Sequence, residues 1–203
     1  MKVYLVRHGK TEWNRDKKFQ GRKNSPLLEE GKEQARLLGQ RLAGKTFAGY
    51  YCSPLPRTCE TASLVVPGRD FTREEAFAEI HLGILEGEGY GHIRPEIKPI
   101  VDQFWYSPQS FDKSLTGGED FEDIRHRSVN RLEELVKQYS EKDEILIVSH
   151  GALLKSVINH YEEKPVKDFW EPPFLQPASL TVISFEKGRF KEIETRGDTS
   201  HYA

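Results

Sequence analysis

The sequence predicts an α/β fold, a three-layer α/β/α sandwich with a mostly parallel sheet and an antiparallel edge strand. Two observations support this prediction. Short apolar runs alternate along the chain with longer segments of helical periodicity, an order that is typical of βαβ units. The run at 145–148 (ILIV) is apolar at every position, as expected of a strand whose two faces are both covered by helices.

The first half of the chain supplies the first of these alternating elements. The expected elements are a strand at 2–6, a helix at 29–43, a strand at 47–52, a helix from Ser53-Pro54 onward and a short edge strand at 71–74. In the helix at 29–43, Ala35, Leu38 and Leu42 share one face. Ser53 is a good N-cap residue and Pro54 suits the first helical position, so the next helix is predicted to begin there.

The next segment, at 80–117, is rich in glycine and proline and shows no regular period. A long irregular segment inside a compact domain is usually functional, and we interpret this one as a lid inserted into a single domain at 1–203. Thr116 and Glu119 fit a capping box before a helix at about 119–139. The remaining elements are predicted as a strand at 145–148, a helix at 151–161 and a terminal hairpin of strands at 181–185 and 190–195.

Composition limits the classes of partner. A net charge of -2 over 203 residues gives no long-range attraction to nucleic acid or to an anionic membrane. Apolar runs stay well short of the roughly 18 residues of a membrane span, and a strand begins within three residues of the N-terminus. We therefore expect a cytoplasmic protein. Cys52 and Cys59 fit no metal pattern and are expected to be reduced and structural, while His92 is expected to face solvent.

Polar motifs follow three of the predicted strands at the point where each strand ends. These motifs are Arg7-His8-Gly9, the segment from Ser53 to Arg57, and Ser149-His150-Gly151. In open α/β sheets ligands bind beyond the carboxyl ends of the strands, so neighbouring strands would bring two histidines and two arginines together. Two guanidinium groups and two helix N-termini suit a phosphoryl group better than a carboxylate.

The histidines then suggest a reaction. A neutral imidazole can attack phosphorus and carry it as phosphohistidine, and His8 lies directly beside Arg7. His150 is expected to be a second donor to the phosphoryl oxygens and, when protonated, to neutralise their charge. The leaving alkoxide needs a proton from a carboxylic acid, for which Glu79 is the first candidate and Glu86 the second.

Together these motifs resemble the histidine phosphatase superfamily, with its phosphoglycerate mutase-like fold. The resemblance runs in order along nearly the whole chain, through LVRHG at 5–9 with Thr11, Trp13 and Asn14, then Gln20-Gly21, Ser53-Pro54-Leu55 with Arg57, Glu79-Ile80, Glu86-Gly87, Gly117-Gly118-Glu119, Val148-Ser149-His150-Gly151 and Asp198-Thr199-Ser200-His201. It implies that His8 is the phosphoryl acceptor and Glu79 the proton donor. It also implies phosphate-pocket contacts for Arg7, Asn14, Gln20, Gly21, Arg57, His150 and Gly151, with no metal and no cofactor.

Departures from the family pattern bear on the reaction. Lys10 stands where the family usually has Glu or Gln, and the chain is shorter than the cofactor-dependent mutases. The segment Glu79-Ile80-His81-Leu82-Gly83 resembles the smaller broad phosphatases. The resemblance therefore favours a phosphatase that acts on a small phosphate ester.

Other functions stay open at this point. A phosphoglycerate mutase is the nearest alternative. A metallohydrolase has little support because no known metal motif is present, and a non-catalytic phosphate-binding module is possible. Phe104, Trp105 and Tyr106 are expected either to close over the leaving group or to hold the insertion down. The substrate and the oligomeric state are not readable from the residues.

Overall fold

The computed structural model describes residues 1–91 and 93–202, so His92 lies outside the described residues. A mixed sheet of six strands forms the centre of the fold, in the order β3-β2-β4-β1-β5-β6. The strands are β1 (Lys2–Arg7), β2 (Gly49–Cys52), β3 (Thr72–Arg73), β4 (Glu144–Ser149), β5 (Leu180–Glu186) and β6 (Arg189–Asp198). The first four in sequence pair in parallel, and β5 and β6 are antiparallel. The predicted sheet is therefore confirmed, with one more antiparallel strand than expected.

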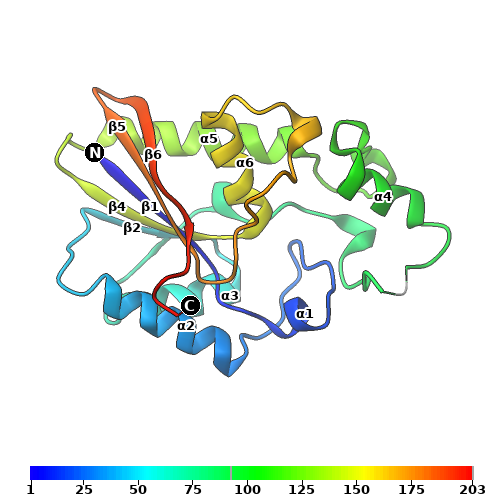
Figure 1. Cartoon of the computed structure of the whole chain (residues 1–203), viewed down its shortest axis with the longest axis horizontal. Helices are drawn as coiled ribbons and strands as arrows, with labels where there is room; N and C mark the ends of the chain where they lie inside the picture. The colour runs from blue at the N-terminus through cyan, green and yellow to red at the C-terminus, as the bar shows by residue number, and fades with distance from the viewer. Residues whose placement is uncertain (92, 203) are drawn as a thin grey trace.

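Helices cover both faces of this sheet (Figure 1). They are α1 (Glu12–Arg15), α2 (Glu29–Arg41), α3 (Pro56–Val65), α4 (Lys98–Tyr106), α5 (Phe121–Gln138) and α6 (Gly151–Tyr161). One face packs against α2 and α3, and the other packs against α5 and α6. None of the helices in the described residues has both the length and the apolar character that a membrane crossing needs.

Strand β4 explains how one continuous apolar run serves two cores. Ile145 and Ile147 belong to the core under α5 and α6, whereas Leu146 and Val148 belong to the core under α2 and α3. Successive side chains of a strand point to opposite faces, so a strand between two helical layers must be apolar throughout. The sequence-based interpretation of 145–148 as a doubly covered strand is confirmed.

Two predicted helix caps do not form. Helix α3 begins at Pro56 rather than at Pro54, because Leu55 precedes a proline and stays extended, and the Ser53 hydroxyl is hydrogen-bonded to His150. Helix α5 is capped by Asp120, whose side chain accepts from the amides of the first turn. Glu119 is engaged elsewhere, so the predicted capping box at Thr116 does not form. In both places a side chain expected to cap a helix contacts a distant segment instead.

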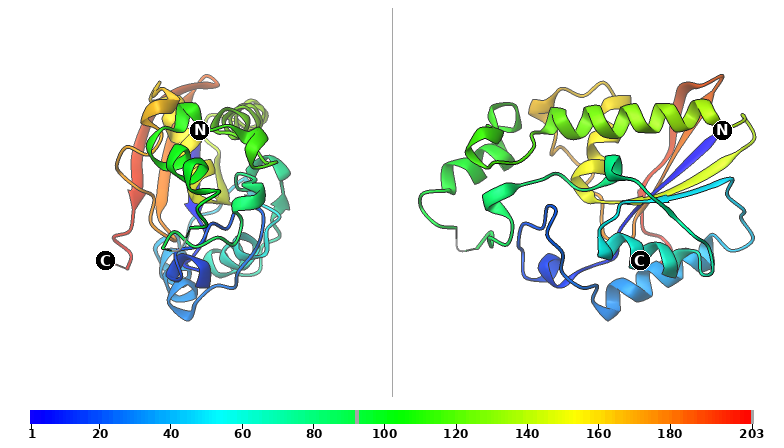
Figure 2. Two further views of the ribbon diagram at one scale, coloured as in Figure 1. Left: turned by 90° about the vertical axis from the view of Figure 1, so that its right-hand side faces the viewer. Right: turned by 180° about the vertical axis from the view of Figure 1, so that it is seen from behind.

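The insertion at 80–117 is more regular than predicted. It contains α4 and several short 3-10 turns, and Figure 1 and the right-hand view of Figure 2 place α4 at the end of the molecule opposite the N-terminus. A third core, separate from the two beneath the sheet, holds it down and includes Phe19, Phe104 and Phe121. Phe104 is buried in this core, whereas Tyr106 is 81% exposed. The residues of the aromatic run at 104–106 therefore do not share one role.

Candidate active site

The three strand ends that carry the polar motifs are neighbours, as the sequence predicts. Strand β4 lies between β1 and β2, and Arg7 is paired in register with Ser149. A cleft of about 200 Å³ opens beyond these ends. Among the predicted site residues the cleft is lined by Arg7, His8, Asn14, Gln20, Gly21, Arg57, Glu79 and Gly151. His150 is the exception, because it lies beneath this surface and is fully buried.

His8 is fixed in one tautomer by its own backbone neighbour. Its ring is 2% exposed, and Nδ1 lies 2.8 Å from the carbonyl oxygen of Gly9. A carbonyl can only accept, so Nδ1 carries the hydrogen and Nε2 keeps its lone pair. Burial, followed by the charges of Arg57 and Arg7, lowers the pKa of His8 well below 6.5. The ring is therefore a neutral imidazole with a free nitrogen in a cationic cleft.

The ring of His150 packs against the ring of His8 on the side away from the cleft. The two rings meet edge to face with their centroids 5.3 Å apart, and Nε2 of His150 lies 2.7 Å from the hydroxyl of Ser53. Burial, with Arg57 as the next cause, lowers the pKa of His150 well below 6.5. Burial thus disfavours the protonated form in which His150 is expected from the sequence to neutralise charge. Nδ1 of His150 is buried and has no hydrogen-bond partner among the described residues.

Two guanidinium groups are held at the cleft by backbone oxygens rather than by carboxylates. Arg7 donates to the carbonyl of Leu175 at 2.5 Å. Arg57 donates to the carbonyls of Lys23 and Gly21, each at 2.7 Å. Burial lowers the pKa of Arg57 to about 10, and repulsion from Arg7 adds to this effect. Carbonyls fix the orientation of both groups without cancelling their charge, which leaves both charges available to an anion.

Glu79 lies at the same cleft and caps α6 from outside that helix. The N-cap residue of α6 is His150, whose side chain makes no capping bond. The carboxyl group of Glu79 instead accepts from the amides of Ala152 at 3.1 Å and Leu153 at 3.0 Å, and from that of Ile80 at 3.0 Å. A carboxylate at a helix N-terminus is favoured by the helix dipole. Glu79 is thus the one acidic side chain that lines the cleft within the described residues.

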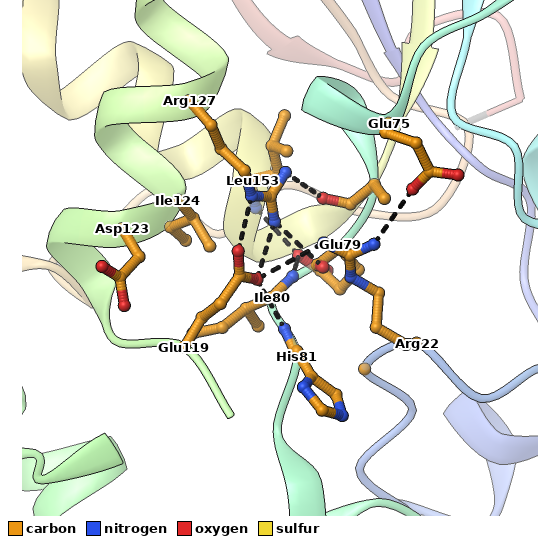
Figure 3. A network of polar contacts seen from close by, with 12 residues as sticks. Arg22, Glu75, Glu79, Ile80, His81, Glu119, Asp123, Ile124, Arg127 and Leu153 are labelled. Carbon is orange, nitrogen blue, oxygen red and sulfur yellow. Dashed lines mark hydrogen bonds and ion pairs between the residues drawn. The ribbon is translucent and has the colours of Figure 1, made fainter. Parts of the chain in front are cut away.

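The backbone that carries Glu79 is clamped by Arg127 and Glu119 (Figure 3). Sequence reasoning did not single out Arg127, and it expected Glu119 to cap a helix. Arg127 donates to three backbone carbonyls within 76–79, at 2.8, 2.7 and 3.1 Å. Its Nε donates to Glu119 at 2.8 Å, and Glu119 also accepts from the amide of His81 at 2.9 Å. The segment is therefore fixed on both sides of Glu79. The Gly117-Gly118-Glu119 motif was the available signal.

Glu86, the second candidate for the proton donor, has a different place. Its buried carboxyl group accepts from the amides of Arg22 at 2.9 Å, Lys23 at 3.2 Å and Leu82 at 3.0 Å. It does not line the cleft. Glu86 holds the loop whose carbonyls orient Arg57, and this indicates a structural role.

Asn14 and Gln20 belong to one polar group at the rim. Thr11 donates to the amide oxygen of Gln20 at 3.1 Å, and the amide oxygen of Asn14 accepts from the Thr11 backbone at 3.1 Å. Ser25 also contacts the oxygen of Gln20, at 3.3 Å. These bonds use the amide oxygen of Gln20, so its NH₂ group remains as the donor for a ligand.

Two glycines of the strand-end motifs are explained by close contacts. A Cβ at Gly9 would lie 2.4 Å from the carbonyl oxygen of Gly31, so Gly9 permits the loop to approach the start of α2. A Cβ at Gly151 would lie 3.3 Å from Nε of Arg7 and would crowd the guanidinium group.

The far end of the cleft contains residues that sequence reasoning missed. They are chiefly aromatic and basic, and include Lys18, Tyr90, Lys155, Trp170 and Phe174. Trp170 and Phe174 belong to a connection without periodic signal, and Lys155 reads as an ordinary helical lysine. The described residues contain no group of three or more His, Cys, Asp or Glu side chains arranged to hold a metal ion.

Residues 3–199 match the histidine phosphatase superfamily (branch 1). The chain belongs to this superfamily. It is 30% identical to a probable phosphoglycerate mutase GpmB of Serratia proteamaculans, over 99% of this chain and 94% of that protein. Its fold is similar to that of Bacillus stearothermophilus YhfR, with a TM-score of 0.92, 35% identity and 98% coverage of both chains. A phosphoserine phosphatase mutant from Entamoeba histolytica in complex with phosphoserine has a TM-score of 0.86 and 27% identity, with 100% of this chain and 99% of that chain covered.

The family membership confirms the resemblance stated from the motifs, and the fold is phosphoglycerate mutase-like. The relatives are named as phosphatases or as probable phosphoglycerate mutases, and one of them holds phosphoserine. Among these relatives, small phosphorylated metabolites are therefore known ligands.

Proposed function

We propose that this protein is a phosphomonoester hydrolase that works through a phosphohistidine at His8, without a metal ion. The observation that carries the proposal is the fixed tautomer of His8. Its Nδ1 hydrogen is committed to the carbonyl of Gly9, and its neutral Nε2 lies in a cleft with Arg7 and Arg57. A buried neutral nitrogen beside two cations is suited to attack an anionic phosphorus centre.

In the first step the lone pair of His8 Nε2 forms a bond to phosphorus as the ester P–O bond breaks. Arg7 and Arg57 neutralise the phosphoryl oxygens, and the buried Nδ1 of His150 is available as a further donor once it carries a hydrogen. Glu79 takes up a proton when the anionic ester binds and gives it to the departing alkoxide. An ionised carboxyl group has about four acceptor sites. Three of these accept amide hydrogens in Glu79, so one site remains for that proton.

In the second step water attacks phosphorus on the phosphoenzyme. The Glu79 carboxylate takes the proton from the attacking water, and the P–N bond breaks so that its electron pair returns to Nε2. Inorganic phosphate leaves, and both His8 and Glu79 regain their starting protonation states. One carboxyl group therefore serves as acid and then as base.

The second candidate function is a phosphoglycerate mutase, favoured by the probable mutases among the relatives. A mutase would return the phosphoryl group to a second hydroxyl instead of to water. It uses the same His8 intermediate, so the two functions differ in how the cleft holds the released alcohol. The short Glu79–Gly83 segment and the similarity to the phosphoserine phosphatase of Entamoeba histolytica support the hydrolase.

A paired assay tests the proposal. Phosphate release from a panel of small phosphomonoesters is measured with and without EDTA, alongside phosphoglycerate mutase activity with and without bisphosphate. We expect release that EDTA does not change and little mutase turnover. Mutase turnover that requires the bisphosphate would replace the hydrolase with the second candidate. Loss of release after chelation would contradict the absence of a metal ion.

A further inference from the structure

Lys155 is a buried cation at the far end of the cleft. It lies on α6, four residues after Gly151, so both positions share one helical face. Gly151 adjoins Arg7, and one helical turn separates it from Lys155 by about 6 Å along the axis. The side chain is 4% exposed and lines the same cleft as His8. Lys155 is therefore placed beyond the phosphoryl group, where the alcohol part of a substrate would lie.

Backbone oxygens hold the ammonium group of Lys155. Nζ donates to the carbonyl of Glu171 at 2.5 Å and to that of Pro173 at 3.3 Å. Within residues 1–91 and 93–202 it makes no ion pair, and burial lowers its pKa to about 8, with Lys164 and Arg196 adding repulsion. Burying a cation without a counter-ion costs free energy, and a neutral donor could serve the two carbonyls equally well. A retained charge points to an anion supplied from outside the chain.

The remaining donor capacity of Lys155 limits what that anion can be. A lysine ammonium has three N–H groups, and two are occupied by the carbonyls. One donor matches a carboxylate better than a second phosphate, which calls for several donors. The surrounding walls, which include Trp170, Phe174 and Leu175, are apolar and suit a short carbon skeleton.

We infer that Lys155 binds a carboxylate on the alcohol part of the substrate, so that the preferred substrates are phosphate esters of small hydroxy acids. The inference rests on the proposed function, since it assigns the substrate class of the same cleft. Lys155 is then a specificity residue. It distinguishes esters by a charged group on the alcohol part, away from the reacting phosphorus.

Two matched substrate pairs test this inference. O-Phosphoserine differs from O-phosphoethanolamine by its carboxylate, and 3-phosphoglycerate has a carboxylate where glycerol 3-phosphate has a hydroxymethyl group. We expect wild-type kcat/KM to favour the carboxylate member of at least one pair by about 10- to 100-fold, as for a hydrogen bond between charged groups. Lys155→Gln keeps N–H donors for the two carbonyls but removes the charge, so this ratio should fall toward one, mainly through KM.

Lys167→Met is the matched control. Lys167 is an exposed lysine of the same connection, and it does not line the cleft. Its loss should leave the ratio unchanged. Lys155→Met, which cannot hold the carbonyls, should lose the ratio as Lys155→Gln does, even if it is less stable.

The outcomes separate the inference from the proposed function. Equal loss on both members of a pair in Lys155→Gln would mean that Lys155 only fastens the 171–173 segment, and would overturn the inference. A wild-type enzyme that hydrolyses p-nitrophenyl phosphate without preferring either carboxylate member would overturn it too, while the proposed function would stand. Failure of the wild type to release phosphate from any ester would remove the proposed function itself.

Discussion

The two ends of the cleft are built differently. At the phosphate end, His8, Arg7 and Arg57 follow strands or begin a helix, and backbone carbonyls orient each of them. At the leaving-group end, the walls come from the insertion at 80–117 and from the connection at 162–179, and are mostly aromatic side chains packed on one another. The first end is held by directional hydrogen bonds, and the second chiefly by apolar contacts, with a few hydrogen bonds such as those of Lys155 and Trp170 to backbone carbonyls.

This difference separates chemistry from specificity. Directional bonds from a sheet edge hold reacting groups within the narrow limits that phosphoryl transfer requires. Apolar packing tolerates substitution provided that volume is roughly conserved, so the same scaffold can accept different alcohols. Changes at the phosphate end should therefore abolish turnover, whereas changes at the other end should alter which ester is used.

The largest effect is expected from His8→Ala. Removing the proposed nucleophile should lower kcat by at least about 10⁴-fold for every ester, because no other histidine lines the cleft within the described residues. Labelling with a radioactive phosphate ester, followed by acid and base treatment, should detect an acid-labile phosphoenzyme in the wild type only. His126→Ala changes an exposed histidine on α5 and serves as the control. A His8→Ala enzyme that keeps a hundredth of the activity would contradict the proposed nucleophile.

A smaller effect is expected from Glu119→Gln, which weakens the clamp on the Glu79 segment. Arg127 would lose its anionic partner, and Glu79 would be held less firmly at the leaving oxygen. We expect kcat to fall by about 10- to 100-fold on alkyl phosphates, part of what a general acid supplies, with KM little changed.

Leaving-group dependence distinguishes this positioning role from a general loss of structure. p-Nitrophenyl phosphate has a good leaving group that needs little protonation, so its turnover should fall much less. Glu122→Gln removes a more exposed acid nearby and should change neither substrate. Equal losses on both esters would show that Glu119 supports the fold rather than proton transfer.

The same contrast explains how much the sequence could predict. Arg7, His8 and Arg57 were identified because strand periodicity ends abruptly at conspicuous polar residues, and parallel neighbours bring such ends together. Glu79 was identified from the need for an acid and from the family resemblance. The lowered pKa of His150 could not be read from the sequence because it depends on burial, which no local pattern records. Helix α4 was missed because glycines and prolines surround it, and the aromatic core that stabilises it joins residues far apart in sequence.

Phe104→Ala tests the leaving-group end directly. Phe104 is 3% exposed and packs on several aromatic rings, so its truncation should cost about 3–5 kcal/mol of unfolding free energy. KM for the preferred ester should rise about tenfold, as for a poorly filled apolar pocket. Urea unfolding and steady-state kinetics measure the two effects. Tyr106→Ala, in the same aromatic run, should change stability by less than about 0.5 kcal/mol. Loss of phosphoenzyme formation in Phe104→Ala would show that the two ends are not separable.

The smallest effect is expected from lowering the pH. Burial and the charges of Arg57 and Arg7 depress the pKa of His8, so the neutral nucleophile should persist below pH 6.5 and be lost only as the pH falls through that lowered value. The profile of kcat/KM reports the free enzyme. Ordinary phosphate esters lose their second proton with a pKa of about 6. After correction for this ionisation of the substrate, kcat/KM should stay flat between about pH 7.5 and about pH 6. A tenfold fall per pH unit starting at 6.5 would mean that His8 is protonated in the free enzyme. The phosphate end would then lack the preformed nucleophile on which the comparison of the two ends depends.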